Sequence, residues 1–153
     1  MFVKVISVLL VVIGGFAVAL QAIINGELSK KIGVIESSLI TFAGGAFILA
    51  LLTVFFGTGK LFIAATVPRW QLIGGVLGVI VMATIIVGVV KLGAAVTIFA
   101  SIAGQLALSI VVDNYGLFGV IRVPFGWQRL LGILLMIAAL VLILRSVPSG
   151  TST

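Results

Sequence analysis

A ladder of polar residues interrupts one of the most apolar stretches of the chain. In "TIFASIAGQLALSIVVDNYG", residues 97–116, every fourth residue is polar: Thr97, Ser101, Gln105, Ser109 and Asp113. Four residues advance an α-helix by about 400°, so successive members drift only ~40° around its axis. A helix here therefore presents them as one slightly slanted stripe.

Gln105 is the member of this ladder that calls for a partner. Serine and threonine hydroxyls can bond back to the carbonyls of their own helix. An unpaired carboxamide in hydrocarbon costs several kcal/mol. We therefore expect Gln105 to face a partner helix, a water-filled cavity or a substrate. A bond that only joins helices is the alternative, and Gly104 beside it would allow the close approach that such packing uses.

A second amide pair lies near the N-terminus, within "GGFAVALQAIINGEL". Gln21 and Asn25 are four residues apart and so share one helix face. They are expected in the half of the bilayer opposite to Asp113, where they reach only part of the ladder of their own chain. An inverted second copy would bring them to the other half. The predicted substrate-binding residues are Gln21, Asn25, Thr97, Ser101, Gln105 and Ser109.

The elements that carry these side chains must be membrane helices. The 153 residues are 63% hydrophobic and 8% charged, with a mean hydropathy of +1.51, so the chain is predicted to be an all-α integral membrane protein. It contains no cysteine and no histidine. Together with the absence of a carboxylate at mid-depth, this argues against an enzyme, a metal site or a cofactor. The net charge of +6 is spread singly and favours contact with membrane lipid over nucleic acid.

Hydropathy and length predict five spans within one membrane domain, residues 1–153, because about 20 apolar residues cross the hydrocarbon. The predicted spans are residues 4–26, 34–56, 70–90, 94–112 and 127–144. The first resembles a secretory signal, with Lys4 before the apolar run and small residues at 17–19, but the run continues beyond that site. It is therefore expected to be retained as a helix. Gly74 and Gly78 are spaced for helix packing in the third span.

The basic residues give almost no preferred orientation. With five spans, one membrane side holds Lys4, Lys60, Arg69, Arg122 and Arg129, and the other holds Lys30, Lys31, Lys91 and Arg145. Orientation follows the difference between such counts. Two interpretations stay open: a weak bias decided by a partner or by loop context, or insertion in both orientations and assembly as an antiparallel pair, as in transporters built from inverted halves.

The amide-bearing segments resemble a known family. "GGFAVALQAIINGELSKKIG" and "GQLALSIVVDNYGLFGVIRVPFGWQRLLGILL" are similar to the YdcZ-like five-span proteins of the drug/metabolite transporter (DMT) superfamily. The resemblance rests on Gln21, Asn25 and Leu28 after a glycine, and on Gly104-Gln105 followed by Asp113. It implies a multi-pass protein of the bacterial inner membrane. It also implies an antiparallel dimer, a ten-helix unit made with an inverted copy or an oppositely oriented paralogue, and it implies transport.

The function expected on these grounds is secondary transport by alternating access at the inverted-dimer interface. Neutral amides and hydroxyls suit a small polar substrate that is neutral or zwitterionic. Small multidrug exporters carry a proton-exchanging glutamate at mid-depth of the first span, where this chain has Gln21 and Asn25, so their mechanism is not expected here. Asp113 is predicted to be a charge anchor held by a basic residue of its own membrane side. The alternatives are a dual-topology small-ion channel and an accessory membrane protein that does not transport.

Overall fold

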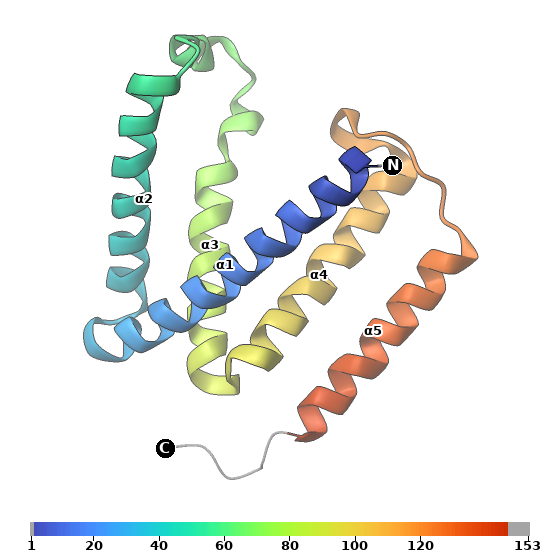
Figure 1. Ribbon diagram of the computed structural model, residues 1–153. Coiled ribbons are helices and arrows are strands. Elements are labelled where there is room, and N and C mark those ends of the chain that lie inside the picture. The colour runs from blue at the N-terminus through green and yellow to red at the C-terminus, as the bar shows by residue number, and fades with distance from the viewer. Residues whose placement is uncertain (1, 147–153) are drawn as a thin grey trace. The chain divides into compact units, whose positions relative to one another are not determined.

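A computed structural model of the chain describes residues 2–146, and helices account for most of them (Figure 1). Five of these helices are long and apolar enough to cross a membrane, which confirms the predicted number of spans. They are α1 (Phe2–Ile32), α2 (Val34–Phe56), α3 (Gly74–Leu92), α4 (Ala94–Tyr115) and α5 (Trp127–Ser146). Three short 3-10 helices lie in the connections: η1 (Leu61–Thr66), η2 (Arg69–Leu72) and η3 (Leu117–Gly119).

The largest differences from the predicted spans are at the end of α1 and at the start of α3. α1 continues six residues beyond the predicted end at 26, to Ile32. Lys30 and Lys31 lie in its last turn, where positive charge complements the helix dipole. The predicted third span began at Trp70, and the helical stretch apolar enough to cross a membrane runs over Arg69–Leu92. Its first residues, 69–72, form the 3-10 helix η2, and α3 starts at Gly74. Pro68 precedes η2, and its carbonyl oxygen accepts a hydrogen bond from the Gln71 amide at 3.0 Å.

Single glycines join α1 to α2 and α3 to α4. Gly33 has φ 99° and ψ 160°, and Gly93 has φ 84° and ψ 161°. Only glycine adopts this conformation without strain. The other two connections are much longer, residues 57–73 and 116–126. If all five helices cross the bilayer, the two glycine joints lie on one side of the membrane and the two long connections on the other.

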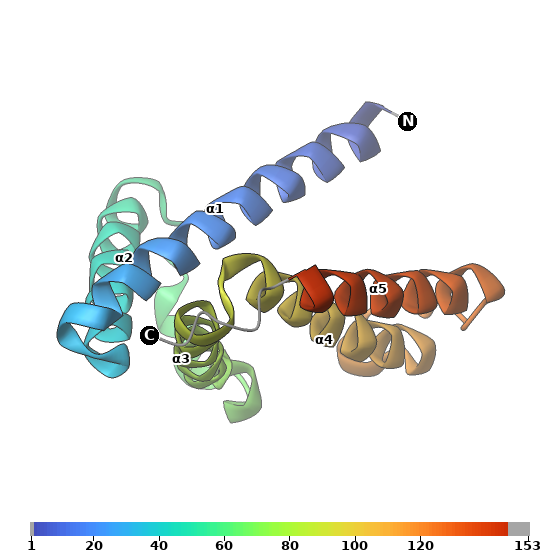
Figure 2. The ribbon, with the colours of Figure 1, turned by 90° about the horizontal axis from the view of Figure 1, so that it is seen from below.

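The chain divides into two units, residues 1–90 and 91–153. In the first, α1 and α2 contact one another near Gly33 and diverge from that joint (Figure 1). In the second, α4 and α5 lie side by side in both views (Figure 1, Figure 2). Each unit is therefore organised around one helix pair.

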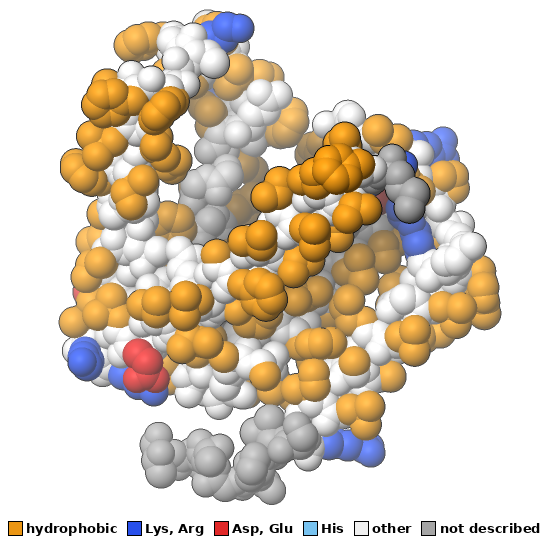
Figure 3. All heavy atoms as spheres, in the orientation of Figure 1, with side chains coloured by type: hydrophobic (Ala, Val, Ile, Leu, Met, Phe, Trp, Pro, Cys, Tyr) orange, Lys and Arg blue, Asp and Glu red, His pale blue; other side chains and the backbone are white. Residues whose placement is uncertain are grey.

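Most large apolar side chains are on the surface. Hydrophobic groups cover much of the visible face, and lysine and arginine lie near helix ends (Figure 3). The buried hydrophobic residues among those described are Ala22, Ile85, Ile86 and Val96. Such a surface is stable against lipid and not against water, so the lipid acts as the solvent for the outer helix faces.

Gly26, on the buried side of α1, lies close against another helix. A Cβ atom added there would lie 2.8 Å from Val89 Cγ1 of α3. At Gly78 the corresponding distance is 3.4 Å, to the Phe42 ring of α2. Within the described residues nothing lies within 4 Å of a Cβ added at Gly74 or Gly104. Gly26, which the sequence analysis did not single out, therefore provides the close approach of α1 to α3.

Gly26→Ala should destabilise the protein by about 1–3 kcal/mol, because the new methyl group would displace the stiff Val89 side chain. Unfolding by SDS in detergent micelles, followed by circular dichroism, measures this. The matched control is Gly14→Ala on the same helix, where a Cβ has nothing within 4 Å among the described atoms. Equal stability of the two variants would contradict the close-packing interpretation.

Candidate functional site

The hydroxyl groups of the α4 ladder are satisfied mainly within the helix. Thr97 Oγ1 donates to the Gly93 carbonyl oxygen at 2.8 Å, and Ser109 Oγ donates to the Gln105 carbonyl oxygen at 2.8 Å. Gln105 Nε2 donates to Ser101 Oγ at 2.9 Å. Thr97 is buried, whereas Gln105 and Ser109 are exposed. Gln105 Oε1 accepts no hydrogen bond from any described residue, so half of the carboxamide has no partner among residues 2–146.

The slant of the ladder separates Gln105 from Asp113. Ala103, Leu106 and Ala107 line a cavity of about 110 Å³ against Ile133, Met136 and Ile137 of α5. On a helical projection, Gln105 lies ~150° from the centre of this α5-facing side. The drift of ~40° per rung brings Asp113 to within ~75° of the same centre. The carboxylate can therefore reach α5, while Gln105 points away from it.

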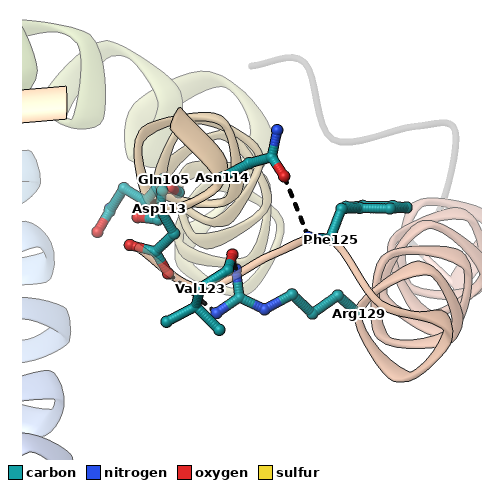
Figure 4. Close-up of polar contacts among 7 residues, drawn as sticks. Gln105, Asp113, Asn114, Val123, Phe125 and Arg129 are labelled. Carbon is teal, nitrogen blue, oxygen red and sulfur yellow. Dashed lines mark hydrogen bonds and ion pairs between the residues drawn. The ribbon is translucent and has the colours of Figure 1, made fainter. Parts of the chain in front are cut away.

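Asp113 and Asn114 hold the end of α4 to the chain that follows. Asp113 Oδ2 forms an ion pair with Arg129 Nη2 of α5 at 3.1 Å, and the two side chains are 29% and 27% exposed. Arg129 is one of the five basic residues considered as partners from the sequence. Asn114 Oδ1 accepts a hydrogen bond from the Phe125 amide at 3.1 Å (Figure 4). The ion pair offsets the unfavourable position of an acid in the last turn of a helix.

Asn25 is the centre of a buried polar cluster that joins three helices. Its Oδ1 accepts from Thr41 Oγ1 of α2 at 2.8 Å, and its Nδ2 donates to Met82 Sδ of α3 at 3.2 Å. The backbone carbonyl oxygen of Asn25 accepts a hydrogen bond from Ser37 Oγ at 3.1 Å. Asn25 is 4% exposed and Ser37 0%. Unlike Gln105, this amide is fully engaged between helices.

Gln21 differs from Asn25 although the two are one turn apart. Gln21 is exposed and makes no side-chain hydrogen bond within the described part of the chain. It lies one turn further from the Gly33 joint, where α1 and α2 have moved apart (Figure 1). The predicted site residues therefore divide by burial: Asn25 and Thr97 are buried, whereas Gln21, Gln105 and Ser109 are exposed. Ser101 is half-buried and hydrogen-bonded to Gln105.

The partners of Asn25 were not predicted from the sequence. Ser37 and Thr41 are four residues apart on the second span, the same spacing that identified the α4 ladder. That spacing could have marked a polar face on α2. Met82 carries no comparable signal, because a methionine in an apolar span is ordinarily packing. Among residues 2–146 no group of histidine, cysteine and acidic side chains could hold a metal ion.

A comparison with protein families identifies the chain. The family model described as "Putative inner membrane exporter, YdcZ" matches residues 6–142, which include most of all five helices. The chain belongs to the YdcZ family. No curated protein and no solved structure matches it.

Membership places the molecule in the DMT superfamily as a multi-pass inner-membrane protein with a transporter-like role. The resemblance drawn from Gln21, Asn25, Gln105 and Asp113 is thus confirmed at the level of the family. The matched region contains both the Asn25 cluster and the Asp113–Arg129 ion pair. Both are therefore parts of the YdcZ domain itself.

The Asp113–Arg129 pair of this YdcZ-family chain should show measurable coupling. In a double-mutant cycle with Asp113→Asn and Arg129→Gln, we expect about 1 kcal/mol of interaction energy, because the pair is largely shielded from water. The control cycle uses Glu27 and Lys30, a pair on α1 whose side chains are 68% and 52% exposed. There the coupling should stay below ~0.5 kcal/mol. Similar values in the two cycles would show that Asp113 is not an anchor.

Proposed function

We propose that this chain is a secondary transporter that moves a small polar metabolite, neutral or zwitterionic, by alternating access. The observation that carries the proposal is the exposed Gln105 side chain, whose Oε1 has no partner among the described residues. In hydrocarbon this would cost several kcal/mol. A substrate, water in a transport pathway or a second chain must supply the missing donor.

The charges around the accessible residues support an uncharged or zwitterionic substrate. Gln21, Gln105 and Ser109 offer amide and hydroxyl groups that both donate and accept hydrogen bonds. Asp113, the acidic residue of α4, is paired with Arg129. A multivalent ion would find no uncompensated charge on this face of α4.

We propose that alternating access takes place in an inverted dimer, in which each of the two chains contributes one α4 ladder. The near-equal counts of basic residues on the two sides permit insertion in both orientations. A polar stripe flanked by Ala100 and Gly104 allows a second helix to approach closely. In this arrangement the exposed Gln21 of one copy approaches the α4 ladder of the other, and the substrate site lies at the interface.

An accessory membrane protein is the second candidate, and one observation favours it. The ladder hydroxyls of Thr97 and Ser109 bond to their own helix, so part of the stripe needs no ligand. In that case Gln105 would only join helices, which contributes below ~1 kcal/mol on average.

Gln105→Leu distinguishes the two candidates. Purified protein in liposomes is first screened with labelled neutral and zwitterionic metabolites, with and without a proton gradient. For a transported compound, Gln105→Leu should lower flux at least about tenfold, the effect of ~1.4 kcal/mol in binding. The folded dimer should be retained, because the substitution removes a costly amide.

Two controls make this result specific. Gln128→Leu makes the same change in the first turn of α5, away from the ladder, and should leave flux unchanged. Asn25→Leu removes the buried bonds to α2 and α3 and should reduce the folded fraction. Normal flux in a well-folded Gln105→Leu variant would exclude the ladder as the substrate site.

Dual topology predicts that C-terminal reporters become active on both sides of the membrane. Two added lysines in the connection 57–60 should shift most molecules to one orientation, because the natural counts differ by one. Two lysines at the Gly93 joint should shift them to the other. A single orientation in the native chain, expressed without any inverted partner, would contradict the proposal.

A further inference from the structure

In the connection between α4 and α5, two backbone amides bond to the end of α4 while the large apolar side chains are exposed. The Val123 amide donates to the Asp113 carbonyl oxygen at 2.9 Å, and the Phe125 amide donates to Asn114 Oδ1 at 3.1 Å (Figure 4). The large apolar side chains of this connection are 40–83% exposed: Leu117, Phe118, Val120, Ile121, Val123 and Phe125. A loop in water would show the opposite arrangement.

The same connection carries uncompensated positive charge. Arg122 is exposed, and its one hydrogen bond among the described residues runs from Nε to the Asn114 carbonyl oxygen at 3.0 Å. The two Nη groups of the Arg122 guanidinium thus remain available to donate hydrogen bonds to an anion. Residues 114–130 contain no acid, and the nearest carboxylate, Asp113, is already paired with Arg129. This surface therefore favours an anionic partner.

We propose that residues 116–126 form a membrane-interface anchor whose apolar side chains enter the outer acyl region while Arg122 contacts the phosphate of an anionic lipid. The irregular backbone of residues 116–126 determines how deep the connection lies in the membrane. Irregular backbone exposed to lipid is not stable within the hydrocarbon core, whereas at the interface water can satisfy the remaining peptide groups. Trp127 begins α5 directly after the connection, which places an aromatic residue where membrane proteins concentrate them.

The charges of the chain argue against a second copy as the partner that covers the apolar surface of residues 116–126. In an inverted copy, the end at this membrane face would carry the two glycine joints. The helix turns next to those joints contain Lys30, Lys31 and Lys91, and also Glu27, which pairs with Lys30, and Glu36. These five charges sum to +1, so this end offers Arg122 no net negative charge, whereas anionic headgroups attract it.

Tryptophan fluorescence in vesicles tests the anchor without knowledge of any transported substrate. The variant Ile121→Trp is made in a background with Trp70→Phe and Trp127→Phe, and circular dichroism confirms the helix content. It is reconstituted in equal parts of phosphatidylcholine and phosphatidylglycerol, with bromine near the top of one acyl chain. The control is Thr58→Trp in the same background, within the polar connection Gly57–Lys60.

Bromolipid should quench the residue-121 fluorophore at least about twofold, since interfacial aromatic side chains contact the upper acyl chains. Aqueous iodide should quench the residue-58 fluorophore more strongly. Quenching of the residue-121 fluorophore by iodide and not by bromolipid would show a loop in water. Protection from both quenchers would show that protein covers the surface. Either result overturns the proposal.

A second comparison tests the headgroup contact. With bromine placed only on phosphatidylglycerol, quenching of the residue-121 fluorophore should exceed that with bromine only on phosphatidylcholine. One basic residue can enrich anionic lipid up to about fivefold. Arg122→Gln should abolish this preference while its amide still donates toward Asn114, and Arg145→Gln should leave it intact. A preference unchanged by Arg122→Gln would overturn the assignment of Arg122.

Discussion

Hydrocarbon offers no hydrogen-bond partner, so each polar group in a span of this chain has to find one within the protein or in something the protein binds. Short hydroxyl side chains meet this requirement locally. Ser38, Thr53 and Thr84 each donate to the carbonyl oxygen four residues earlier, as Thr97 and Ser109 do. Carboxamides are too demanding for this, since each has two donors and an acceptor. Gln21, Asn25 and Gln105, the carboxamides away from the helix ends facing the long connections, are therefore the positions where the fold needs something beyond a helix.

The helix ends obey a related electrostatic constraint. α1, α3 and α5 end in turns that contain Lys30 and Lys31, Lys91 and Arg145, which complement the negative end of the helix dipole. α4 has no basic residue in its last turn and carries Asp113 there instead. Arg129, Arg122 and the Val123 amide supply the missing positive groups from the following chain. These contacts add to the C-cap of α4, where Gly116 in the left-handed conformation donates its amide to the Val112 carbonyl oxygen.

The sequence is sufficient for the number of spans, because apolar length is a local property. The sequence also limits the candidates for the ion-pair partner of Asp113 to the five basic residues on its membrane side, one of which is Arg129. It does not reveal the different environments of Gln21 and Asn25. Their spacing places them on one helix face, but burial depends on how far α2 has diverged at each turn. Met82 as the acceptor for Asn25, and Gly26 against Val89, depend on packing between distant segments, which spacing along one helix does not encode.

Comparison of the two central amides connects the fold to the proposed transport. Asn25 is held by Thr41 and Met82, so removing a partner would leave a buried group unpaired. Such an amide fixes helix positions and is poorly suited to exchange partners during a cycle. The Gln105 side chain is held by one hydrogen bond within its own helix. Its side-chain oxygen Oε1 can therefore bind and release a donor without disturbing the packing of α4 on α5. A group that must hold a substrate in one state and release it in the next needs this second kind of environment. For the proposed transporter, the α4 ladder is therefore the better place for a substrate, and the Asn25 cluster the better place for a fixed contact.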